Sequence, residues 1–124
     1  INIIILVCVI RCTSTYPTVP EEVNLKHINT LSKKYPNLKV GFSNHYNGVD
    51  ACVGAVALGA ECVEFHITND RTSYGSDQSA SIENSDVLVD AIRKMEMMLG
   101  DGVKKVYESE KPIAKKLRKN NDTI

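Results

Sequence analysis

The sequence predicts an α/β protein with a parallel sheet, and three observations lead to this prediction. Short apolar stretches that suit strands alternate with stretches of helical period, in the order β-α-β-α-β-α. The connections between the predicted strands are long enough for the crossovers that parallel pairing requires. The predicted strands 38–43 and 60–66 are each accompanied by a histidine at the carboxyl end, which is where α/β proteins build their sites.

Length and composition narrow the class of protein. The chain has 124 residues, enough for one modest domain. Acidic and basic residues number 15 each, so no charge excess indicates a nucleic acid or a membrane surface as partner. The four cysteines form no C-x-x-C pair and lie in apolar stretches, which favours reduced thiols and a cytoplasmic location.

The first predicted strand begins with residues 1–10, which are apolar except for Asn2, and it continues to Ser14. The apolar run is too short to span a membrane. It also lacks the positive residues and the small-residue cleavage site of a signal peptide. A buried strand of a parallel sheet fits better, and a chain that starts inside a buried strand is expected to be a fragment.

A helix is predicted over residues 20–35. Thr18 and Glu21 fit a capping box at its start. His27 falls outside the apolar stripe and is interpreted as a solvated helix residue. The stripe recurs at helical spacing and consists of Leu25, Ile28, Leu31 and Tyr35.

The middle of the chain predicts a strand, a helix and another strand. After the strand 38–43, Asp50 is expected to cap a helix over 51–58, with Gly59 as its stop. This helix is apolar on all sides and should be buried. The strand 60–66 follows.

A polar loop over residues 68–81 exceeds the usual length of a connection, and such loops are often functional. Ser85 is expected to cap the last clear helix, which Gly100 ends. Residues 101–124 hold seven of the fifteen basic residues between positions 104 and 119. This segment is interpreted as a solvated basic tail or a linker rather than a nucleic-acid patch.

Strand parity predicts that the polar residues gather on one face, because side chains two apart in a strand share a face. Ser43 shares a face with His45, and Glu64 shares a face with His66. The first strand contributes Cys12 and Ser14, with Tyr16 just beyond. Facing the helices instead are the large apolar residues Phe42, Val63 and Phe65.

Two histidines on neighbouring strands suggest a divalent metal or an anion site. Without a third obvious ligand they fall short of a zinc signature. Histidines with a purely structural role are therefore an equally good interpretation of the residues alone.

Six blocks of the sequence, in order and at matching spacing, resemble successive blocks of the sialic acid (N-acetylneuraminate) synthases: residues 12–18, 22–25, 40–45, 55–60, 64–68 and 75–81. The resemblance implies an α/β fold of the TIM (β/α)8 barrel type, of which residues 1–100 would be the last three βα units. A barrel of about 250 residues would then lack its first five units, and the small antifreeze-like domain that usually follows would be absent.

The resemblance implies a transferase that condenses phosphoenolpyruvate with N-acetylmannosamine or a related sugar, giving a nine-carbon 2-keto acid and phosphate. The full-length protein is expected to be a cytoplasmic homodimer without nucleic-acid or membrane partners, and the fragment alone is expected to be inactive. His45 and His66 match the ligands of Mn²⁺ or Mg²⁺, which acts as a Lewis acid. The remaining matches are Ser14 and Ser43 near phosphoenolpyruvate, Tyr16 and Asp77 at the sugar, and Glu64 as an orienting group.

Three departures from the family pattern leave the sugar open. Asn44 stands where an acidic residue or glycine is common, Phe65 where a basic residue is usual, and Tyr46 where threonine is frequent. The family's phosphate-binding lysines lie on strands that this chain does not contain. Two rival hypotheses are a non-catalytic truncated remnant of a barrel and another phosphoenolpyruvate-dependent synthase of keto-sugar acids.

Overall fold

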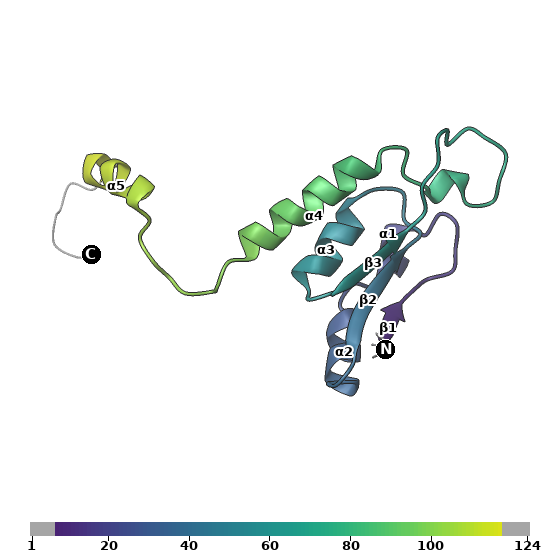
Figure 1. Cartoon of the computed structure of the whole chain (residues 1–124), viewed down its shortest axis with the longest axis horizontal. Coiled ribbons are helices and arrows are strands. Elements are labelled where there is room, and N and C mark those ends of the chain that lie inside the picture. The colour runs from purple at the N-terminus through teal and green to yellow at the C-terminus, as the bar shows by residue number, and fades with distance from the viewer. Residues whose placement is uncertain (1–6, 118–124) are drawn as a thin grey trace, which may run out of the picture.

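The computed structural model describes residues 7–117 and contains a three-stranded parallel sheet (Figure 1). Its strands are β1 (Cys8–Arg11), β2 (Lys39–Asn44) and β3 (Cys62–Phe65), and their order in the sheet is the order in the chain. The α/β fold with a parallel sheet is therefore confirmed. Of the first predicted strand, residues 1–6 lie outside the described residues.

The register of the sheet agrees with the parity argument. Phe42 pairs with Val63, so both point to the same side. One residue further along, Ser43 pairs with Glu64 on the opposite side. Phe42 is only 3% exposed within the hydrophobic core, and Val63 packs against that core. The polar pair therefore lies on the face that the helices do not cover.

Helices α2 and α3 contact the sheet, and α4 packs against α3 (Figure 1). The described part of the chain, residues 7–117, contains no helix that is long and apolar enough to cross a membrane. The helices are α1 (Pro20–Val23), α2 (His27–Lys34), α3 (Asp50–Ala57), α4 (Ser85–Leu99) and α5 (Lys111–Leu117).

The core lies between β2 and helices α1 to α4, each of which contributes buried residues to it. Burial of apolar surface there is the main force that holds the three layers together. Two side chains contributed by different helices, Ile28 and Leu88, are fully buried. The remaining core residues are Val23, Val40, Phe42, Ala51, Cys52 and Ala55.

The single helix predicted over residues 20–35 is wrong, because the chain forms α1 and α2 with a break between them. Asn24 at the break has a φ of 46°, in the left-handed region that asparagine tolerates better than most residues. The capping box is also wrong: Val19 is the N-cap of α1. The hydroxyl of Thr18 donates instead to the carbonyl oxygen of Thr15, 2.9 Å away.

Two further predicted caps are shifted by one residue. Asp50 and Ser85 are the first residues of α3 and α4 rather than their N-caps. The cap of α4 is Asn84, whose side-chain oxygen accepts a hydrogen bond from the backbone N–H of Asp86 at 3.0 Å.

The described part of the basic segment, residues 101–117, leads away from the sheet and includes α5 (Figure 1). The sequence predicted no helix here. The backbone N–H of Tyr107 donates to the carboxylate of Glu110 at 3.3 Å at the start of the short 3-10 helix Glu108–Glu110, which leads directly into α5. The apolar side chains of α5, Ile113 and Leu117, are exposed.

Candidate functional site

His45 follows the last residue of β2 and is held from two sides. The residue is buried, with 5% of its surface exposed. The Nδ1–H group donates to the carbonyl oxygen of Thr13 at 2.6 Å, and the backbone N–H of Thr18 donates to the carbonyl of His45 at 2.8 Å. Because a carbonyl only accepts, this contact places the ring proton on Nδ1 and leaves the Nε2 lone pair free.

Asn44 fixes the turn that presents His45. The side chain is 1% exposed and points away from the histidine face. Its Nδ2 group donates to the carbonyl oxygens of Tyr46 at 2.9 Å and Gly48 at 3.3 Å. Its Oδ1 atom accepts from the N–H of Tyr46 at 3.2 Å. An amide satisfies both donors and acceptors of this turn, which gives the departure at Asn44 a structural role.

Three rings from three different segments meet beside the ends of the strands. The ring centroids of His45 and His66 are 5.1 Å apart. The ring of Tyr16 lies 4.2 Å from that of His45 and 5.7 Å from that of His66, the latter in an edge-to-face arrangement. The structure thus brings together both predicted metal ligands and one predicted sugar-binding residue.

The loop over residues 68–81 brings Asp77 to the same place. Ile67 and Ile82 form an isolated bridge that closes the base of the loop. Near its end, the hydroxyl of Ser81 donates to the carbonyl of Asp77 at 2.8 Å. The carboxylate of Asp77 then lies 3.7 Å from Nδ1 of His66. The long loop therefore places the carboxylate of Asp77 beside His66.

The surroundings of Tyr16 raise the pKa of its hydroxyl. Desolvation raises the pKa of its hydroxyl above the ordinary value of 10.0, and the nearby carboxylate of Asp77 raises it further. Cys12 and Glu64 act in the same direction with smaller effects. The phenol therefore stays protonated at neutral pH and is a hydrogen-bond donor to a ligand in this space.

The two predicted hydroxyl groups differ in exposure. Ser43 is 6% exposed and pairs in register with Glu64, which is itself exposed. Ser14 is exposed, on the loop after β1. Among the described residues, the carboxylate of Glu64 makes no hydrogen bond to either imidazole.

Cys12 belongs to this site, although the sequence argument gave it no role. Its Sγ atom lies 3.9 Å from Nδ1 of His45 and 3.6 Å from the hydroxyl oxygen of Ser14. Strand parity had already placed Cys12 on the face of Ser14. The carbonyl of Thr13, by contrast, carried no signal in the sequence, because every residue has such a group.

The donors present fit a metal only as a partial site. Within residues 7–117, no group of three or more histidine, cysteine, aspartate or glutamate side chains is placed to hold an ion. The free Nε2 of His45, with its other nitrogen bonded to a backbone carbonyl, matches the usual environment of a metal-binding histidine. Nitrogen donors suit a transition-metal ion better than Mg²⁺, which prefers oxygen. Further ligands would have to come from outside these residues or from substrate.

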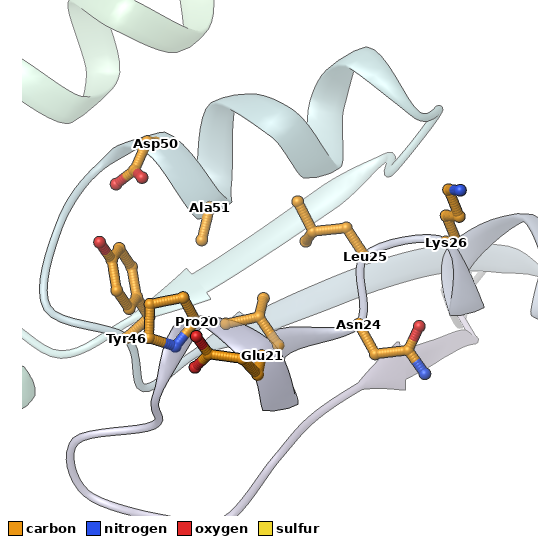
Figure 2. A pocket seen from close by; sticks show the side chains of 9 residues that line it. Pro20, Glu21, Asn24, Leu25, Lys26, Tyr46, Asp50 and Ala51 are labelled. Carbon is orange, nitrogen blue, oxygen red and sulfur yellow. The ribbon is translucent and has the colours of Figure 1, made fainter.

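A pocket of about 410 Å³ lies elsewhere and includes none of the predicted site residues. It is formed by α1, the segment before α2, and the start of α3. Figure 2 shows Tyr46 and Asp50 near one end of this pocket and Lys26 near the other. Ser43 and His45, by contrast, line a space of only about 10 Å³.

Fold and site together define a class: a parallel α/β protein with its polar residues gathered where the strands end. Comparison with known proteins then specifies the family. Residues 5–104 match the NeuB family, and the chain belongs to that family.

Two curated proteins with similar sequences are both named as synthases. The human N-acetylneuraminate-9-phosphate synthase is 43% identical over 115 residues, which cover 91% of this chain and 32% of that protein. The N,N'-diacetyllegionaminic acid synthase of Campylobacter jejuni is 37% identical over 116 residues, which cover 92% of this chain and 34% of that protein. The chain thus spans about a third of the length of these curated relatives.

A solved structure shares the fold. It is the N-acetylneuraminic acid (sialic acid) synthetase of Leptospira borgpetersenii in complex with citrate. It matches with a TM-score of 0.73 and 34% identity, over 91% of this chain and 41% of that one.

Proposed function

We propose that this chain supplies the histidine side of the active site of a sialic acid synthase-like enzyme. The reaction is the condensation of phosphoenolpyruvate with N-acetylmannosamine or a related sugar, with release of phosphate and formation of a 2-keto acid. Support comes from membership of the NeuB family and from relatives named as an N-acetylneuraminate-9-phosphate synthase and an N,N'-diacetyllegionaminic acid synthase. The observation that carries the proposal is the pair of imidazoles 5.1 Å apart at the ends of β2 and β3.

The three strands are proposed to be consecutive strands of a TIM (β/α)8 barrel. All three are parallel, neighbours in the sheet are neighbours in the chain, and the helices pack on one face only. That arrangement is expected of a barrel segment, where the uncovered face lines the interior. In this arrangement the face with Ser43 and Glu64 is the inner face, and the site lies at the mouth.

His45 and His66 are proposed to hold Mn²⁺, which would supply Lewis acidity at the aldehyde oxygen of the sugar. The chain's own residues account for orientation. The carbonyl of Thr13 fixes the tautomer of His45 and Asp77 lies beside His66, so both rings are positioned before substrate arrives.

The remaining groups are proposed to bind the two substrates. The hydroxyls of Ser14 and Ser43 suit the phosphate and carboxylate of phosphoenolpyruvate, because an anion accepts hydrogen bonds from neutral donors. The protonated phenol of Tyr16 and the carboxylate of Asp77 offer one donor and one acceptor to the hydroxyls of a sugar. Glu64, on the same face as His66, remains a proposed orienting group.

The test uses a complete barrel in which residues 7–100 of this chain replace the matching third of a sialic acid synthase. Phosphate release from phosphoenolpyruvate is measured with and without N-acetylmannosamine and with and without Mn²⁺. We expect release only when both are present, and no turnover by the 124-residue chain alone. A panel of other aldoses identifies a synthase of a different keto-sugar acid. Keto-acid formation by the isolated chain would contradict the proposal that the rest of the barrel is needed.

A further inference from the structure

Asp77 lies in the interior of the polar loop, residues 68–81, rather than at its base. The base itself is fixed by the backbone. The N–H of Ile82 donates to the carbonyl of His66 at 2.8 Å, and the N–H of Thr68 donates to the carbonyl of Ile82 at 3.1 Å. These bonds hold the two ends of the loop but do not reach its interior. The position of Asp77 beside His66 therefore needs a further support within the loop.

Arg71 is the residue that crosses the loop. Its Nη2 group donates to the carbonyl oxygen of Ser79 at 3.1 Å. Ser79 belongs to the 3-10 helix η1 (Gln78–Ala80), which begins directly after Asp77. The N–H of Ala80 donates back to the carbonyl of Asp77 at 3.1 Å. The bond from Arg71 thus reaches the short helix that is itself bonded to Asp77.

The turn around Arg71 is ordered by hydrogen bonds of its own. Oδ1 of Asp70 accepts from the hydroxyl of Thr72 at 2.7 Å and from its backbone N–H at 2.8 Å. These two bonds lower the pKa of the Asp70 carboxyl below its ordinary value, so the turn is intact at neutral pH. The backbone N–H of Arg71 donates to the carboxylate of Glu83 at 3.0 Å. The side chain of Arg71 therefore starts from a fixed point.

The side chain of Arg71 acts on the backbone rather than through charge pairing. It is the one basic residue of the loop, yet among residues 7–117 it forms no ion pair. Its Nε atom is shielded from solvent and has no hydrogen-bond partner in the described part of the chain. The loop thus uses one terminal donor of the guanidinium, which a lysine ammonium can also supply.

We propose that Arg71 is a positioning residue that holds Asp77 beside His66 by tying η1 to the start of the loop. Its kinetic consequence rests on the proposed function, in which Asp77 accepts hydrogen bonds from the sugar. Because the carboxylate lies 3.7 Å from Nδ1 of His66, a displacement of η1 would carry it away from both the ring and the sugar. Phosphoenolpyruvate should be affected much less, since its proposed partners Ser14 and Ser43 lie on other segments.

Loss of the Arg71 bond should loosen the loop without unfolding the protein. The hydroxyl of Ser81 still donates to the carbonyl of Asp77 at 2.8 Å, and the bridge between Ile67 and Ile82 still closes the base. The hydrophobic core contains no residue from this loop. We therefore expect weaker sugar binding and a more mobile loop, with an almost unchanged free energy of unfolding.

The kinetic test uses a complete barrel that contains residues 7–100 of this chain. Arg71→Met keeps a long side chain but removes every donor, whereas Arg71→Lys keeps a cationic donor. We expect Arg71→Met to raise KM for N-acetylmannosamine about tenfold, a typical effect of one hydrogen bond from a charged donor, and KM for phosphoenolpyruvate less than about twofold. Arg71→Lys should restore most of the loss. Arg93→Met, on α4, is the matched control and should change neither KM.

A double-mutant cycle shows whether Arg71 acts through Asp77. Asp77→Asn alone is expected to raise KM for the sugar. If Arg71 serves only to position this carboxylate, adding Arg71→Met to Asp77→Asn should raise KM no further. Fully additive effects of the two changes would overturn the proposal. An equal rise in KM for both substrates would overturn it as well.

Limited proteolysis tests the loop without any measurement of activity. Tyr74 is a fully exposed residue of this loop, so the rate of chymotrypsin cleavage after it reports the mobility of the backbone rather than access to the side chain. We expect cleavage about tenfold faster in Arg71→Met, matching the lost hydrogen bond, and near the wild-type rate in Arg71→Lys and Arg93→Met. Tyr74→Ser identifies the cut by abolishing it.

The outcomes separate this inference from the proposed function. A barrel that makes no keto acid would contradict the proposed function, whereas the cleavage rates would still decide the role of Arg71. Wild-type cleavage in Arg71→Met would overturn the positioning role. So would a lower urea midpoint together with faster cleavage throughout the barrel, because Arg71 would then stabilise the whole fold rather than the loop.

Discussion

Replacing His45 or His66 by alanine is expected to lower kcat/KM for the condensation roughly a thousandfold, about 4 kcal/mol, in a complete barrel that contains this chain. Residues 7–117 bring together two imidazoles and no larger set of metal-binding side chains. Loss of either ring would therefore remove half of the donors that this chain offers. Phosphate release from phosphoenolpyruvate at saturating Mn²⁺ is the measurement.

The double variant is the sharper part of this prediction. If both rings serve the same ion, His45→Ala combined with His66→Ala should be little worse than either change alone. His27→Ala is the matched control. It should keep full activity, because His27 lies at the start of α2 and is not one of the rings that meet at the site. A double variant with wild-type activity would contradict the proposal that these two histidines bind the metal ion. Because His66 is partly exposed, its variant also guards against a simple folding defect at the buried His45.

Phe42→Ala is expected to lower the free energy of unfolding by about 3–5 kcal/mol. Phe42 is 3% exposed on the central strand, and it belongs to the core that joins the sheet to the helices. Truncation removes the buried ring and leaves a cavity, because α2 and α3, which both contact β2, cannot fully close on the space. Urea denaturation followed by circular dichroism measures the change.

Two controls accompany this measurement. Phe42→Leu keeps most of the volume and should cost much less than the alanine variant. Tyr74→Ala changes a fully exposed ring in the polar loop and should alter stability by no more than about 0.5 kcal/mol. A loss below about 1 kcal/mol for Phe42→Ala would contradict the placement of this ring in the core.

Periodicity predicted most of the fold because burial enforces it. The alternation of Phe42 and Ser43 assigned opposite faces to them, and the register of the sheet shows those faces. The helix predicted between Ser85 and Gly100 is likewise formed, as α4, and its Leu88 is completely buried. Such patterns survive in the sequence because a shift of one residue would expose the whole apolar set.

The sequence did not predict the break between α1 and α2, because a single residue in the left-handed region does not change the spacing of the apolar residues. The apolar spacing continues through Leu25 and Ile28 as though one helix were present. Asn24 is compatible with a helix interior as well as with the turn it forms. The capping box failed for a related reason, since the hydroxyl of Thr18 found closer acceptors within its own loop.

The candidate site was only partly predictable. His45 and His66 could be placed side by side because parallel strands end at one edge of the sheet. The approach of Asp77 to His66 depends on how a long loop folds back, which no periodic pattern describes.

The central claim is that His45 and His66 bind one metal ion, and Mn²⁺ tests it directly in a complete barrel that contains this chain. Mn²⁺ is paramagnetic and broadens the ring proton signals of histidines close to it. The account predicts that the signals of His45 and His66 broaden together at low Mn²⁺ while those of His27 stay sharp, and that His66→Ala weakens the effect on His45. Equal broadening of all three histidines, or sharp signals from His45 and His66 throughout the titration, would contradict it.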